Sequence, residues 1–119
     1  MRIRNKSTYQ ICNRLIAHTS EGVKVETLEE PFNITAYIYK ASGQMATQLY
    51  GQELKYIFNM LTDEPYNPTI INGKLCYSNG VNSFAEGDRI HVFNSEEPDF
   101  KIVSIAQHGH LEIVLEMLH

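Results

Sequence analysis

The chain has 119 residues, of which 43 % are hydrophobic and 20 % are charged, and its formal net charge is −4. This size and composition fit one globular domain, which we place at residues 1–119. The mild acidity argues against a dedicated nucleic-acid binder, although a clustered basic patch can exist within a negative total. No apolar run approaches the roughly 20 residues of a membrane span, and no apolar segment of a secretory signal follows the basic N-terminus.

The first third of the chain is predicted to be β. Residues 11–18 have a mixed pattern that favours a strand mainly by context, and Ser20-Glu21-Gly22 is a turn signal. Val23 and Val25 begin a short alternating piece. Residues 32–40 give the clearest strand of this half, and the strand as a whole is rich in β-branched and aromatic residues. One apolar row of its side chains is expected to face the core. That row is Phe32, Ile34, Ala36 and Ile38.

The middle of the chain changes period. Apolar residues follow a helical spacing that predicts a short helix over residues 52–61, with a strand at residues 45–50 before it. The residues that carry this spacing are Leu54, Ile57, Phe58 and Leu61. Asn72-Gly73 tolerates the positive φ values of a tight turn, so residues 69–71 and 74–77 are predicted to form a hairpin. The Ser-, Asn- and Gly-rich residues 78–87 are predicted to form a surface loop.

The last third alternates apolar and polar residues in three runs, at residues 89–93, 100–106 and 111–117. Because successive side chains of a strand point to opposite faces, each run can place one apolar row in a core. Phe100, Ile102, Ser104 and Ala106 are expected to share one face, opposite Lys101, Val103 and Ile105. Short connections predict a C-terminal three-stranded antiparallel meander.

The predicted fold is therefore mainly β: a small antiparallel β-barrel or a two-sheet sandwich, with one short helix and the C-terminal meander. A sheet with one apolar face must close on itself or stack on another sheet to bury that face. The sequence leaves barrel and sandwich open.

The chemistry-bearing residues form no recognisable catalytic set. His91, His108 and His110 could gather on a zinc ion, and the alternative is a polar hairpin tip. Cys12 and Cys76 lack metal-ligand spacing and have no histidine nearby in the sequence, so we expect two reduced thiols. We predict no catalytic residues, no bound metal and no cofactor, and expect that the chain is not an enzyme.

Seven tyrosines favour protein contacts, since tyrosine is enriched at interfaces. Tyr37 and Tyr39 share a strand face and could instead be a stacking platform for single-stranded nucleic acid. The candidate oligomer or partner contacts are Tyr37, Tyr39, Ser78, Asn79, Gly80, Val81, Asn82, Ser83 and Phe84.

Two patches carry a family resemblance. The first is Ala46-Thr47-Gln48-Leu49-Tyr50-Gly51, followed by Asn59-Met60-Leu61. The second is Gly87-Asp88-Arg89-Ile90, then Asp99-Phe100-Lys101-Ile102-Val103-Ser104-Ile105 and His110-Leu111-Glu112-Ile113. They resemble sequences of the small head-completion or head–tail connector proteins, also called minor capsid proteins, of tailed bacteriophages and prophages of Gram-positive bacteria.

The resemblance implies a structural protein of the virion, made in the bacterial cytoplasm and assembled at the head–tail junction. It implies a homo-oligomeric ring between a portal or adaptor and the tail, in contact with packaged DNA but without sequence-specific binding, and no membrane partner. The loop at residues 78–86 and the turn at residues 42–43 would then make the contacts. Two alternatives remain: an OB-like nucleic-acid-binding module, and a small metal-dependent enzyme that uses His91, His108 and His110.

Overall fold

The computed structural model describes residues 5–41, 48, 51 and 56–118. Its strands, in chain order, are β1 (Ser7–Cys12), β2 (Arg14–His18), β3 (Lys24–Leu28), β4 (Phe32–Lys40), β5 (Ile57–Thr62), β6 (Asn67–Ile71), β7 (Lys74–Ser78), β8 (Ser83–Phe84), β9 (Arg89–His91), β10 (Phe100–Gln107) and β11 (Leu111–Met117). The described part of the chain is almost entirely β, which confirms the predicted fold class.

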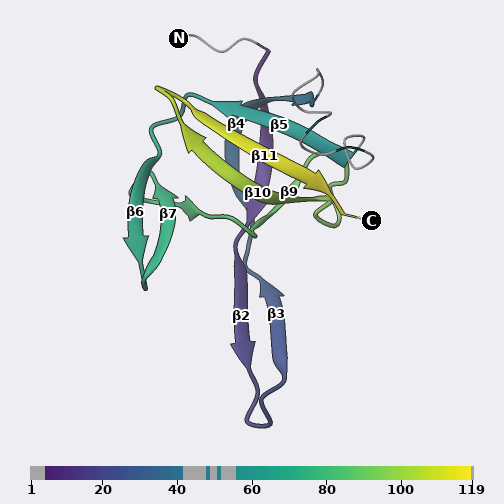
Figure 1. Ribbon diagram of the computed structural model, residues 1–119, viewed down its shortest axis with the longest axis vertical. Helices are drawn as coiled ribbons and strands as arrows, with labels where there is room; N and C mark the ends of the chain where they lie inside the picture. The colour runs from purple at the N-terminus through teal and green to yellow at the C-terminus, as the bar shows by residue number, and fades with distance from the viewer. Residues whose placement is uncertain (1–4, 42–47, 49–50, 52–55, 119) are drawn as a thin grey trace.

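Six strands close into an antiparallel barrel in the order β1-β4-β5-β11-β10-β9 (Figure 1). The closing contact is the pairing of β1 with β9, in which Ile11 lies opposite Ile90. This contact decides between the two predicted architectures, because a sandwich would leave both strands as edges. The remaining strands form two small sheets, β2-β3 and β6-β7-β8.

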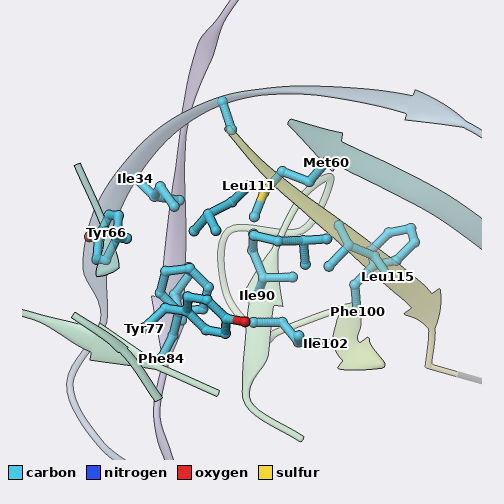
Figure 2. Close-up of a cluster of buried hydrophobic side chains, with 13 residues drawn as sticks. Ile34, Met60, Tyr66, Tyr77, Phe84, Ile90, Phe100, Ile102, Leu111 and Leu115 are labelled. Carbon is cyan, nitrogen blue, oxygen red and sulfur yellow. The ribbon is translucent and has the colours of Figure 1, made fainter. Parts of the chain in front are cut away.

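The barrel interior is filled by side chains from every one of its strands (Figure 2). Ile34 of β4, Met60 of β5 and Phe100 of β10 have no exposed surface. Phe100 packs edge-on against Phe58, with ring centroids 5.1 Å apart. The predicted inward row of β4 is confirmed, since Ile34 and Ala36 are buried and Phe32 and Ile38 pack against the core.

The predicted C-terminal meander is confirmed, with one correction. β9, β10 and β11 are consecutive antiparallel neighbours, but a bulge in β10 shifts the register between Ile102 and Ser104. An extra residue in one strand moves the following side chains to the other face. Ile105 therefore packs against the core opposite Ile113, and the expectation that it faces away from Ile102 is wrong.

The helix predicted over residues 52–61 is wrong from Ile57 onward, because Ile57–Thr62 is strand β5. This strand lies between β4 and β11, which supply ladder partners along its two edges. Residues 52–55 lie outside the described residues, as does the expected strand at 45–50 apart from Gln48.

Two further expectations need correction. The strand predicted at residues 11–18 is interrupted at Asn13, where β1 leaves the barrel wall and β2 begins. The loop predicted at residues 78–87 includes β8, whose Phe84 is only 1 % exposed and packs in the core. Among the described residues, no helix has the length and apolar character needed to cross a bilayer.

Candidate functional site

The hairpin β2–β3, here called the arm, projects from one end of the barrel along the long axis of the molecule (Figure 1). A turn closes it, with Gly22 at a φ of +82° and its amide donating to Thr19 O at 2.9 Å. Nine of its ten strand residues are exposed, and only Arg14 is half-buried. The contacts of the arm with the rest of the molecule include hydrogen bonds at its base and an ion pair of Glu26 with Arg89 of β9.

A buried carboxylate anchors the base of the arm. Asp88 is 3 % exposed, and its two oxygens accept hydrogen bonds from Arg14 N at 2.9 Å, Asn13 Nδ2 at 3.0 Å and Ala85 N at 2.8 Å. These contacts tie the first residue of the arm to the segment that follows β8. The preceding Gly87 has a φ of +94°, and a Cβ there would lie 2.5 Å from the Arg14 guanidinium. The arm therefore leaves the barrel in a fixed direction.

The second projection is the hairpin β6–β7, here called the side hairpin. Its turn is Asn72-Gly73, with φ values of 51° and 77°, as the sequence predicts for a tight two-residue turn. Ile70 and Leu75 lie opposite each other on one face and are 66 % and 51 % exposed. On that same face, toward the barrel, Tyr77 is buried and stacks on Phe84.

A groove of about 460 Å³ lies between the base of the arm and the side hairpin. Its apolar lining includes Leu15, Ile16 and Ile71, and its charged lining is Arg14, Glu29, Lys74 and Asp88. Two basic and two acidic residues make no basic track for a phosphate backbone, and apolar side chains beside balanced charges suit a protein partner better. Most of the exposed large hydrophobic side chains among the described residues lie on the two hairpins and the groove.

The two predicted tyrosine contacts lie on the outer wall of the barrel. The rings of Tyr37 and Tyr39 stack with centroids 5.4 Å apart, and Tyr39 is 37 % exposed. The pKa of Tyr39 is raised, first by burial and then by Glu112 and Tyr37. A carboxylate beside the stacked pair opposes a nearby phosphate and so weakens the nucleic-acid interpretation.

The predicted contact loop is divided by burial. Asn79 Oδ1 accepts from Val81 N and Asn82 N at 2.9 and 2.7 Å, which forms a tight turn and leaves Val81 87 % exposed. Asn79 and Gly80 are exposed like Val81. Ser78, Asn82 and Ser83 are half-buried, and Phe84 is in the core. Residues 42–43, the other expected contact, lie outside the described residues.

The three histidines do not form a metal site in the part of the chain that the structure describes, where no three His, Cys, Asp or Glu side chains are grouped as ligands. His91 Nδ1 lies 2.9 Å from Asn94 O, and His110 Nε2 lies 3.5 Å from Glu112 Oε1. His108 donates its backbone amide to His110 O at 2.8 Å across the β10–β11 turn. His108 and His110 thus lie at a polar hairpin tip, which is the alternative to a metal site given in the sequence analysis.

Sequence reasoning missed one contact between a cysteine and a histidine. Cys12 Sγ lies 3.6 Å from His91 Nε2, although the two residues are 79 positions apart. Because Asn94 O can only accept, His91 Nδ1 carries a proton, and in the tautomer with an unprotonated Nε2 the thiol donates to Nε2. Burial, and then the charge of Asp88, raise the pKa of Cys12. The neutral thiol is thus favoured, so the pair forms a partly buried hydrogen bond and lacks the thiolate that a nucleophile needs.

The exposed arm was also missed by sequence reasoning, although a signal for it exists. Leu15, Ile16 and Val25 are apolar residues on both faces of one hairpin, which a strand with one buried face does not show.

Comparison of the chain with protein-family models, with curated proteins and with solved structures finds no match.

Proposed function

We propose that this protein is a structural component of a tailed-phage virion that acts by protein–protein docking at the head–tail junction. The observation that carries the proposal is the pair of projecting hairpins, each with bulky apolar side chains exposed to solvent. Monomeric proteins rarely expose contiguous apolar surface, and such surface is typical of interaction sites. In this proposal the barrel is a rigid base and the hairpins contact the neighbouring proteins.

The resemblance described above supports the same role through the barrel. Apart from Gln48 and Gly51, its described residues fall on β5 and on the segment from Gly87 to Ile113, which builds β9, β10 and the start of β11. The proposed partners are a portal or adaptor on one side and a tail protein on the other, with the chain assembled as a homo-oligomeric ring. The proposed location is the virion, reached from the host cytoplasm. A net charge of −4 suits a ring through which DNA passes without being gripped.

One observation favours a second candidate, an OB-like module for single-stranded nucleic acid. Small antiparallel barrels bind bases on stacked aromatic rings, and Tyr37 and Tyr39 are a stacked pair on a barrel strand. A fluorescence titration with labelled oligonucleotides at two salt concentrations separates the two functions. The docking function predicts no salt-sensitive binding at micromolar protein, and tight binding that weakens with salt would favour the OB-like function.

The direct test is deletion of the gene in the phage or prophage that carries it. We expect DNA-filled heads without tails, or heads that lose their DNA, and rescue by the wild-type gene. An Ile70→Asp/Leu75→Asp variant should fail to rescue, because it charges the apolar face of the side hairpin. Ser95→Asp, in the exposed loop between β9 and β10, is the matched control and should rescue. Normal infectious virions without the gene, or virions that lack the protein by mass spectrometry, would refute the proposal.

A further inference from the structure

The outer edge of β3 carries unpaired backbone groups at defined positions. Two arm hydrogen bonds, Glu29 N to Asn13 O and Thr19 N to Val23 O, both at 2.8–2.9 Å, fix which residue pairs exchange bonds with β2. Since hydrogen-bonded and non-hydrogen-bonded pairs alternate, the N–H and C=O groups of Lys24, Glu26 and Leu28 point away from β2. Among the described strands, β3 pairs with β2 alone. This edge is thus a template for another strand.

We propose that the β3 strands of two copies of this chain pair antiparallel, edge to edge, about a two-fold axis at Val25. Lys24 of one copy then lies opposite Glu26 of the other, and the same pair forms a second time by symmetry. Both are hydrogen-bonded pairs in this register, so each supplies two backbone hydrogen bonds, and Val25 faces Val25 of the second copy between them. The result is a four-stranded sheet built from two arms.

Charge complementarity selects both the partner and the register. A two-fold axis at Glu26 would place two carboxylates opposite each other, and an axis at Lys24 would oppose two ammonium groups, which is unfavourable across strands. The axis at Val25 instead opposes each charged residue of β3 to an opposite charge. A sequence that complements itself in this way favours a second copy over an unrelated partner, and an isologous contact is the commonest form of self-association.

The faces of the arm fit this sheet. Leu15, Ala17, Val25 and Thr27 share one face, which carries no charge, whereas the charged residues all lie on the other. Pairing would extend the uncharged face across four strands. A lone two-stranded hairpin is only marginally stable in water, whereas three or more strands with an apolar face are stable. The contact thus adds stability to the two strands of the arm and covers an edge that would otherwise invite aggregation.

The ion pair already present on the arm does not block this contact. Glu26 Oε1 accepts from Arg89 Nη2 at 2.9 Å, and the carboxylate has a second oxygen for Lys24 of the other copy. The contact goes beyond the proposed function and does not depend on it. A two-fold contact closes on itself, so it describes paired copies of the free protein and adds to any ring formed at a virion.

Disulfide trapping tests the register directly. In a Cys76→Ser background, Val25→Cys places two thiols in a non-hydrogen-bonded pair with Cα atoms about 4.5 Å apart, within disulfide range. We expect mild oxidation to give a covalent dimer and no larger species. The matched control is Thr27→Cys, on the same face of β3, because the Thr27 Cα atoms of the two copies would lie roughly 13 Å apart along the strands. Equal trapping of both variants, or trapping of neither, would overturn the proposal.

Charge exchange tests the pairing without oxidation. Lys24→Glu replaces two attractive pairs by two repulsive ones, so we expect the dimer measured by analytical ultracentrifugation to weaken roughly 10- to 100-fold. Lys24→Glu/Glu26→Lys restores opposite charges across the axis and should recover the dimer, although it removes the ion pair with Arg89. If the double variant stays as weak as the single one, the register is wrong. The alternative is head-to-tail pairing of β3 with β2 of another copy. It would give a ladder of disulfide-linked multimers from an Ile16→Cys/Leu28→Cys variant and no dimer from Val25→Cys, and this result would also overturn the proposal.

Discussion

Asp88 is the residue whose removal should most directly loosen the arm. Asp88→Ala leaves three donors without their acceptor: the amides of Arg14 and Ala85 and the side-chain amide of Asn13. Each buried donor left unpaired costs about 1–3 kcal/mol. Because Arg14 is half-buried, its amide should lose less than a fully buried donor, and we expect a total loss of about 3–5 kcal/mol. That is a large part of the roughly 6–18 kcal/mol typical of a chain of this length.

Urea denaturation measures this loss. With a slope of about 1–3 kcal/mol/M, the midpoint of Asp88→Ala should fall by roughly 2 M. Asp88→Asn is the matched control, because it keeps one acceptor oxygen and nearly the same volume, and it should lose about half as much. Hydrogen exchange should show the Arg14 amide opening faster in Asp88→Ala than global unfolding predicts. A loss below about 1 kcal/mol, or equal losses in both variants, would refute the idea that this carboxylate anchors the arm.

Three further predictions concern the barrel. Phe100→Ala should lower the free energy of unfolding in urea by about 3–5 kcal/mol, because Phe100 is fully buried between aromatic rings. Ile70→Ala, at the exposed side hairpin, should change it by less than about 0.5 kcal/mol. Similar losses in the two variants would mean that Phe100 is not in the core. Thr62→Val should cost about 1–3 kcal/mol, because the buried Thr62 hydroxyl donates to Thr35 O at 2.8 Å and accepts from Glu64 N at 3.2 Å; an unchanged midpoint would contradict both bonds. Cys12 should make the free energy of unfolding fall at alkaline pH. Its pKa is raised above the ordinary 9.0, so above pH 9.0 the folded state keeps the thiol proton that the unfolded state has lost. Stability that is present below pH 9.0 should therefore fall as the pH rises through the folded pKa. The free energy of unfolding should depend less steeply on pH in Cys12→Ala than in the wild type. The raised pKa values of Tyr39 and Tyr66 lower stability at alkaline pH in both proteins. Parallel curves for the two proteins would contradict the role given to Cys12.

Where the sequence pattern failed, a long-range contact overrode it. Residues 57–61 have helical spacing, yet they form β5 because β4 and β11 satisfy its backbone along both edges. Over a window this short, the two periods differ by few positions, so the pattern alone does not separate helix from strand.

The candidate site could not be predicted from the sequence for the same reason: it depends on contacts between distant residues. The break at Asn13 depends on its side-chain bonds to Ser83 O at 2.7 Å and to Asp88, residues 70 and 75 positions away. The pairing of Cys12 with His91 likewise joins distant segments. Turn residues and alternation describe neighbours along the chain, and neither gives any information about such partners.

The sequence by itself determined the strands whose signal is local: β4, β10, β11 and the hairpin turn at Asn72-Gly73. For these, alternation and the tolerance of positive φ depend only on adjacent residues. Only the tertiary structure decided that β1 closes against β9 into a barrel, that the bulge in β10 turns Ile105 inward, and that β2 and β3 leave the barrel as an arm. Each of these depends on which distant strand supplies the hydrogen bonds and the covering surface, and that choice is made by the whole chain when the barrel closes.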